Sequence, residues 1–178
     1  MKKQDILILS AVMLALVLIR VYFNIPNFNP LGAIALMGGV LFGRNLLAFL
    51  IPVSALFVGD LLLASNNALN QDYLFSASFL TVYASFGIMI ALGMLLAKKP
   101  SLSSVIGGSL LAAIAFFIVT NAGAWITLPD YPKTSNGLMS AYTAGIPFFR
   151  NTLISQVVFS IGIYAVYSFA TQRKMAIA

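Results

Sequence analysis

The sequence contains no cysteine and no histidine. It therefore has no disulfide, no thiolate nucleophile, and neither thiolate nor imidazole to hold a zinc-type metal ion. A serine nucleophile would lack histidine as its general base, and no Gly-Lys-Ser/Thr loop is present to bind a nucleotide phosphate. An aspartyl dyad needs two neighbouring carboxyl groups, whereas only Asp60 lies within an apolar segment. We therefore expect neither an enzyme nor a resident metal or cofactor.

Charged residues are also scarce. They make up 8% of the chain, against about a quarter in soluble domains, while hydrophobic residues make up 61% and the mean hydropathy is +0.99. Such a chain belongs in a lipid bilayer, where helices satisfy the backbone polar groups within their own segment. Because the apolar runs are continuous and do not alternate with polar residues, a transmembrane barrel is excluded. We predict an all-α integral membrane protein that forms one domain over residues 1–178.

The apolar runs predict six membrane-spanning helices with short polar breaks between them. No small-x-small cleavage site precedes the end of the first run, where Arg20-Val-Tyr-Phe stands, so we interpret this run as a span and not as a signal peptide. The run after Pro30 is short, which leaves open whether it crosses fully or re-enters. Pro52 is expected to bend the third helix. The predicted helices cover residues 6–23, 31–43, 46–64, 74–97, 105–127 and 147–171.

The basic residues predict the orientation of these spans. Six spans place both termini on one side of the membrane, and if that side is the cytoplasm, only Arg20, Lys133 and Arg150 lie on or towards the outside. This distribution fits the positive-inside rule and predicts a multi-pass protein of the bacterial inner membrane with both termini cytoplasmic. Because basic residues stand at the ends of apolar runs, the net charge of +6 does not indicate nucleic-acid binding. The cytoplasmic basic residues would be Lys2, Lys3, Arg44, Lys98, Lys99, Arg173 and Lys174.

Two ionisable side chains, Arg20 and Asp60, fall within predicted spans. A charged side chain at the centre of the membrane costs about 2.5–3.5 kcal/mol on insertion scales, so such residues are candidates for function. Both lie in the outer part of their helices, where long side chains reach the interface. The sequence leaves two interpretations open, namely a structural Arg20–Asp60 pair and direct contact of both residues with a ligand.

Further polar groups gather near the outer ends of the last two predicted helices. Asn121 and Trp125 stand one turn apart on one helix face and would suit a flat polar ligand, or else form an interhelical hydrogen bond and an interfacial anchor. Pro147 fits the first turn of a helix, which would place Arg150 and Asn151 near free backbone N–H groups that favour an anion. The alternative role for Arg150 is anchoring at the membrane interface.

The segment between these helices is expected to be a polar loop. Its side chains, Asp130, Tyr131, Lys133, Asn136 and Tyr142, would form either a lid over a binding site or an ordinary solvated loop with turns fixed by proline. The chain thus concentrates its polar groups on one side of the membrane.

The second predicted helix carries small residues at four-residue spacing, Ala35, Gly39 and Gly43. Small side chains on one face let a neighbouring helix approach closely. We expect this face to pack against another helix, either of the same chain or of a partner subunit.

Five stretches of the sequence carry a family resemblance. They are residues 27–36 (Asn-Phe-Asn-Pro-Leu-Gly-Ala-Ile-Ala-Leu), 59–61 (Gly-Asp-Leu), 121–125 (Asn-Ala-Gly-Ala-Trp), 131–138 (Tyr-Pro-Lys-Thr-Ser-Asn-Gly-Leu) and 146–152 (Ile-Pro-Phe-Phe-Arg-Asn-Thr). The chain resembles, over nearly its whole length, an uncharacterised bacterial family of putative membrane transport proteins. In the number of its helices and its general layout, that family is similar to the substrate-binding S components of energy-coupling-factor (ECF) vitamin transporters.

The resemblance to S components implies a bundle of six helices with an outward-facing vitamin pocket. It also implies partners, a transmembrane coupling subunit and ATPases, with the coupling subunit docking on an Ala-x-x-x-Ala pattern of the first helix. Ala11 and Ala15 match that pattern. Some vitamin B12-type members use a cysteine as a cobalt ligand, and the absence of cysteine and histidine here argues against capture of cobalamin by that chemistry.

We therefore expect a protein that binds a small polar or vitamin-like solute from the outer face of the membrane. Without a nucleotide-binding loop it would depend on a partner or an ion gradient for energy. The alternative is a structural or accessory subunit of a larger membrane complex, which uses the glycine-lined second helix for docking. The candidate solute-binding residues are Arg20, Asp60, Asn121, Trp125, Tyr131, Arg150 and Asn151, and the candidate docking residues are Ala11, Ala15, Gly39 and Gly43.

Overall fold

The computed structural model describes residues 3–22, 25–66, 68–97 and 100–170. Every regular element within these ranges is an α-helix, as predicted. The helices are α1 (Lys3–Tyr22), α2 (Leu31–Phe42), α3 (Leu47–Asn66), α4 (Ala68–Tyr73), α5 (Ala77–Leu96), α6 (Leu102–Thr127) and α7 (Ser135–Ala170).

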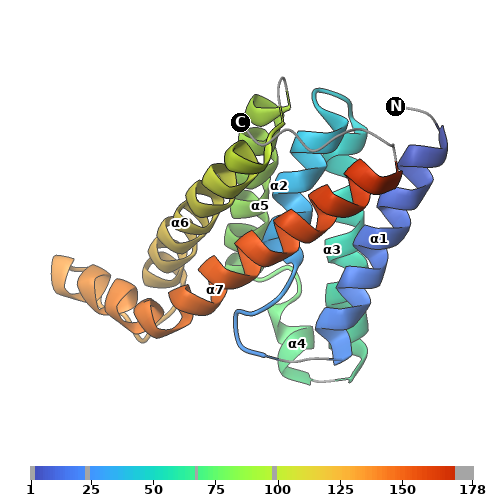
Figure 1. Ribbon diagram of the computed structural model, residues 1–178. Coiled ribbons are helices and arrows are strands. Elements are labelled where there is room, and N and C mark those ends of the chain that lie inside the picture. The colour runs from blue at the N-terminus through green and yellow to red at the C-terminus, as the bar shows by residue number, and fades with distance from the viewer. Residues whose placement is uncertain (1–2, 23–24, 67, 98–99, 171–178) are drawn as a thin grey trace.

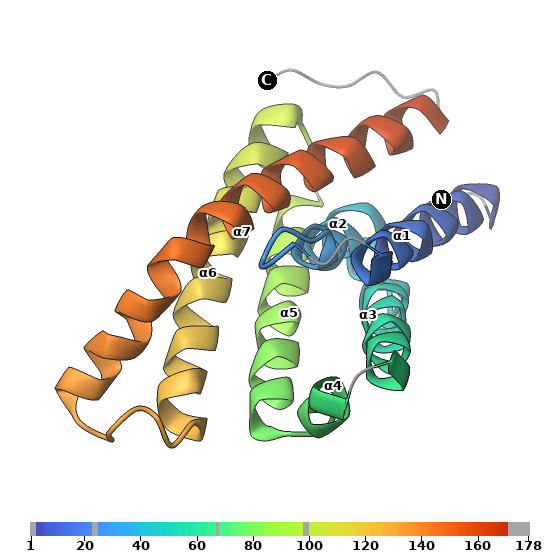
Figure 2. The same cartoon turned by 90° about the horizontal axis from the view of Figure 1, so that it is seen from below.

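The long helices alternate in direction. The first turn of α1, the turn between α2 and α3, the end of α5 and the last turn of α7 lie at the upper end of the bundle in Figure 1. The α1–α2 loop, the short helix α4 and the α6–α7 loop lie at the lower end. Figure 2 shows α6 running beside the first half of α7, while the second half of α7 crosses towards α1.

The centre of the bundle is α2, which packs against α3, α5 and α7. Apart from Gly32, its residues are buried. Its closest neighbour is α5, since a Cβ atom on Gly39 would lie 2.1 Å from the carbonyl oxygen of Ile90, and one on Gly93 would lie 2.0 Å from that of Leu36. The two glycines therefore let the backbones of α2 and α5 touch, as expected from small residues on a helix face.

Four helices are long and apolar enough to cross a membrane, namely α3, α5, α6 and α7. The apolar part of α1, Ile6–Tyr22, and the whole of α2 are shorter. With 12 residues, α2 extends over about 18 Å, less than the roughly 30 Å of a hydrocarbon core. The length and composition of these four helices are consistent with a multi-pass membrane protein, and α2 lies inside the bundle between its neighbours.

Two predicted boundaries were wrong. The polar segment 65–73, expected to be a loop, contains α4. The last helix begins at Ser135 and not at residue 147, so Pro147 lies inside α7. Residues 135–146 were assigned to a polar loop because Pro147 fits the first turn of a helix, yet they form the first part of α7, where Gly137 packs closely against the preceding chain. A Cβ atom on Gly137 would lie 1.9 Å from the carbonyl oxygen of Pro132.

Candidate functional site

The two ionisable residues predicted within the spans meet in space. The Nη1 atom of Arg20 on α1 donates to Oδ1 of Asp60 on α3 at 2.7 Å, and the hydroxyl of Tyr83 on α5 donates to Oδ2 at 2.8 Å. Asp60 is 6% exposed and Arg20 22% exposed. Both carboxylate oxygens thus have a donor, which a buried charge requires.

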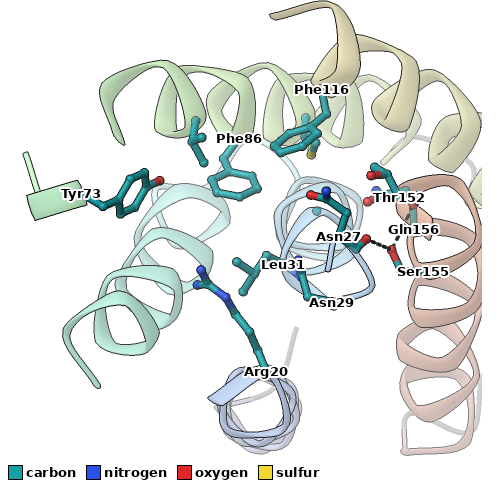
Figure 3. A pocket seen from close by; sticks show the side chains of 13 residues that line it. Arg20, Asn27, Asn29, Leu31, Tyr73, Phe86, Phe116, Thr152, Ser155 and Gln156 are labelled. Carbon is teal, nitrogen blue, oxygen red and sulfur yellow. Dashed lines mark hydrogen bonds between the residues drawn. The ribbon is translucent and has the colours of Figure 1, made fainter. Parts of the chain in front are cut away.

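A cavity of about 170 Å³ lies beside this pair. Its wall is formed by α1, α2, α4, α5, α6, α7 and the α1–α2 loop, so that segments from almost the whole chain converge on it (Figure 3). The guanidinium group of Arg20 and the ring of Tyr73 point towards its interior. The lining residues are Arg20, Asn27, Asn29, Leu31, Gly32, Tyr73, Val82, Phe86, Met89, Phe116, Thr152, Ser155 and Gln156.

The α1–α2 loop is fixed in place by hydrogen bonds at both of its sides. Nδ2 of Asn151 donates to the carbonyl oxygen of Pro26 at 3.0 Å, and Oγ of Ser155 donates to that of Asn27 at 3.4 Å. Oδ1 of Asn29 accepts from the backbone N–H of Leu31 at 3.1 Å and so caps the start of α2. These bonds join the loop to α7 and α2, so the part of the cavity wall that the loop forms is already ordered.

Gln156 is the most unusual polar group of the cavity. Its side chain is 2% exposed, and its Nε2 atom has no hydrogen-bond partner among the described residues. Its Oε1 atom lies directly over Gly32, where a Cβ atom would come within 2.2 Å. A buried amide without a partner costs about 1–3 kcal/mol, so such a group in a folded protein calls for an explanation.

Tyr73 brings a hydroxyl group to the cavity from α4. Burial raises the pKa of Tyr73 above its usual value, the charge of Asp60 raises it further, and Arg20 lowers it. The hydroxyl is therefore protonated at physiological pH and can donate a hydrogen bond. Edge-to-face contact with Phe79, with ring centroids 5.5 Å apart, fixes the orientation of the ring.

Asn121 lines a second, smaller cavity of about 120 Å³, which shares Asn27, Phe116 and Thr152 with the main one. Its Nδ2 atom donates to the carbonyl oxygen of Phe117 in its own helix at 2.7 Å. Its Oδ1 atom faces Gly145 of α7, where a Cβ atom would lie 2.3 Å away. Asn121 therefore lies near the main cavity but not in its wall.

Trp125 and Tyr131 line neither cavity. Nε1 of Trp125 donates to the carbonyl oxygen of Pro132 at 2.9 Å. Nζ of Lys133 donates to the carbonyl oxygens of Trp125, Leu128 and Tyr131, the last two at 2.9 and 3.1 Å. A cation bound to the last carbonyls of a helix is a C-terminal cap. These residues thus build the α6–α7 connection.

The predicted loop lid was wrong in part. Asn136 and Tyr142 belong to α7 and not to a loop, and the hydroxyl of Tyr142 donates to the carbonyl oxygen of Ile118 on α6 at 2.9 Å. Asp130 is exposed in the α6–α7 connection. The bonds of Tyr142 and Lys133 fasten the first part of α7 to the end of α6.

The predicted anion site at Arg150 and Asn151 was also wrong. Both residues lie inside α7, far from its first turn, so no free backbone N–H groups surround them. Arg150 is exposed and lines neither cavity. Asn151 acts instead on the α1–α2 loop through its bond to Pro26.

The candidate docking residues fall into two groups. Ala11 and Ala15 are exposed on the outside of α1. Gly39 is covered by α5 of the same chain, which leaves no room for a partner helix there. Gly43 ends α2 with a φ of +60°, a left-handed conformation that favours glycine. The glycine face of α2 therefore serves the packing within the chain.

One family model matches residues 1–177, nearly the whole chain. It describes a family of unknown function (DUF6580). The chain belongs to this family. No curated protein and no solved structure matches it. In the described part of the chain, no group of three or more acidic side chains is placed to hold a metal ion.

Several cavity residues of this DUF6580 member were missed in the sequence. Gln156 was read as part of an apolar run, although an amide within a span is a signal of its own. Asn27 and Asn29 were assigned to a break between spans and to a stretch that carries the family resemblance, but not to a site. Tyr73 and Ser155 carry no signal at all, since their role depends on which helices become neighbours.

Proposed function

We propose that the protein binds a small polar solute in the main cavity as part of a membrane transport system. The observation that carries this proposal is the buried amide nitrogen of Gln156, which has no partner in the described part of the chain, in a cavity that six helices and a loop build together. Ligand sites in helical membrane proteins lie between helices and combine apolar walls with a few polar groups. This cavity has that composition.

The orientation of the cavity supports uptake from outside. Its lining includes residues of the α1–α2 loop and of α4, which lie at the lower end of Figure 1, whereas Arg44 lies in the α2–α3 turn at the upper end. The two terminal segments, which hold four of the ten basic residues, adjoin the first turn of α1 and the last turn of α7 at that upper end. Under the positive-inside rule, the upper end is cytoplasmic and the cavity faces the periplasm of a bacterial inner membrane. Uptake of a solute is the function that suits this orientation.

The comparison with S components of ECF transporters belongs to the same proposal. An alternating bundle with an outer cavity fits such a subunit, and the exposed Ala11 and Ala15 offer a small-residue face on α1 for a coupling subunit. Their neighbours on the outer face, such as Leu7 at 70% exposure and Leu14 at 43%, would meet lipid or that subunit. Energy would then come from the partner ATPases.

The proposal is tested by thermal unfolding of the purified protein against a panel of vitamins and small metabolites. A true solute at one hundred times its Kd stabilises the folded state by about 2.7 kcal/mol. Gln156→Leu is expected to abolish the stabilisation, whereas Ser140→Ala, on the exposed side of α7, should leave it unchanged. Loss of uptake of the same solute in a deletion strain completes the test.

Two outcomes would count against this function. One is the absence of stabilisation by any compound together with unchanged uptake in the deletion strain. The other is stable co-purification with subunits of a complex unrelated to transport, which favours the accessory role. Co-purification with a coupling subunit and ATPases supports the S-component assignment.

A further inference from the structure

The charges beside the main cavity already balance. Among the described residues that line it, the one cationic group is Arg20. This group is paired with Asp60, which also accepts from the hydroxyl of Tyr83. A carboxylate on a ligand would have to compete with Asp60 for Arg20, and a cation would meet the guanidinium group itself. Either charge would be poorly solvated between helices, where an unpaired ion is costly. The cavity therefore favours an uncharged ligand.

The polar groups of the wall include several hydrogen-bond donors. Among the described residues, Nε2 of Gln156 has no partner, Tyr73 carries a protonated hydroxyl, and one guanidinium nitrogen of Arg20 is bonded to Asp60. Oδ1 of Asn29 is used by the cap of α2, and the backbone carbonyl of Asn27 accepts from Ser155. A ligand that satisfies these donors presents acceptors, such as a carbonyl oxygen or a ring nitrogen.

The remaining wall is apolar and aromatic. Phe86 and Phe116 face the cavity with ring centroids 5.9 Å apart and an interplanar angle of 26°. Val82, Leu31 and Met89 complete this side. Aromatic and thioether groups pack well against a flat ring. The volume of about 170 Å³ is close to that of an engineered cavity of about 150 Å³ that holds benzene, so it has room for one substituted ring.

From charge, donors and shape together, we propose that the cavity selects an uncharged, planar compound of one ring that carries a carboxamide-like group. This inference rests on the proposed function and specifies its solute. The ring lies against Phe86 and Phe116, and the carbonyl oxygen accepts from Nε2 of Gln156. The α1–α2 loop, which Asn151 binds to α7, lines the cavity with Asn27 and Asn29.

The test uses three probes of one shape and three charges, namely benzamide, benzoate and benzamidinium. Binding to the full-length protein in nanodiscs is measured by saturation-transfer NMR, which detects millimolar affinities. Benzamide is expected to bind at least about tenfold more tightly than either ion, a difference of about 1.4 kcal/mol. Competition between benzamide and each of the other two probes gives the ratio of their dissociation constants directly.

Two variants locate the binding. Gln156→Leu removes the free donor. It is expected to raise the Kd for benzamide about tenfold, as the loss of one hydrogen bond does. Gly32→Ala places a Cβ atom where Oε1 of Gln156 lies, and so displaces the amide with a similar loss. Ser140→Ala is the matched control for partition of the probe into lipid and should bind benzamide like the wild type.

Each outcome decides the ligand class separately from the proposed function. Preference for benzoate or benzamidinium overturns the uncharged class, while a solute that stabilises the protein through Gln156 would leave the proposed function standing. Equal benzamide signals from the wild type and both cavity variants, or no signal with any probe, also overturn it. Benzamide selectivity lost in both variants but kept in Ser140→Ala establishes it.

Discussion

Replacing Asp60 with alanine is expected to lower the free energy of unfolding by about 3 kcal/mol. The change leaves Arg20 without its carboxylate in a bundle where water is scarce, and it also removes the acceptor of the Tyr83 hydroxyl. We expect the lower end of the range for broken buried pairs, about 3–5 kcal/mol, because Arg20 is 22% exposed and can turn towards the surface. Denaturant titration of the purified protein in detergent measures the loss.

The double variant Arg20→Met with Asp60→Leu is the control for this prediction. It replaces both charges with apolar side chains, so it should lower the free energy of unfolding less than Asp60→Ala alone does. Tyr83→Phe removes only one hydrogen bond and should cost about 1 kcal/mol. A single Asp60→Ala variant as stable as the wild type would show that the pair contributes nothing to the fold.

The second large effect is expected at the contact between α2 and α5. Gly39→Ala places a methyl group 2.1 Å from the carbonyl oxygen of Ile90. The obstacle is a helix backbone and cannot rotate away, so the two helices must separate in the centre of the core. We expect a loss of about 3 kcal/mol, at the upper end of overpacking effects. The measurement is the same denaturant titration.

Gly107→Ala is the matched control for Gly39→Ala. It is also a helical glycine, on α6, but apart from the adjoining backbone of its own helix, no described atom lies within 4 Å of its new Cβ position. Alanine is the better helix former by about 0.5–1 kcal/mol, so this variant should be equally stable or slightly more stable. Equal losses for both variants would contradict the close α2–α5 contact.

The parts of the fold that were predictable follow from costs that a bilayer imposes. Arg20 and Asp60 were recognised because charges in apolar runs are rare, and they do meet. Gly39 was recognised because small residues at four-residue spacing permit close packing, and it does touch α5. In both cases the residue type alone restricts what can lie next to it in an apolar helix: a charge needs a partner, and a glycine face permits close packing.

Other features depend on tertiary contacts that no local pattern reveals. The start of α7 was misplaced because Pro147 resembles a first-turn proline, whereas the actual first turn is capped by Thr134, whose Oγ1 accepts from the N–H of Gly137 at 3.2 Å. Arg150 was assigned to an anion site on the strength of that boundary. The burial of the Gln156 amide above Gly32 depends on the packing of α7 against α2, which its own position in the sequence does not reveal.

The most direct measurement uses the absence of cysteine from the chain, which makes an introduced thiol the only one. Thr152→Cys places that thiol in the wall shared by both cavities, and Ser140→Cys places one on the exposed side of α7. The rate of modification by a membrane-impermeant thiosulfonate, added from outside to intact cells stripped of bound solute, is measured with and without a low-molecular-weight metabolite extract. A solute-binding cavity that faces outwards predicts that the extract slows modification of Thr152→Cys and leaves Ser140→Cys unaffected. Equal rates for Thr152→Cys with and without the extract, or reaction only after the membrane is permeabilised, would contradict it.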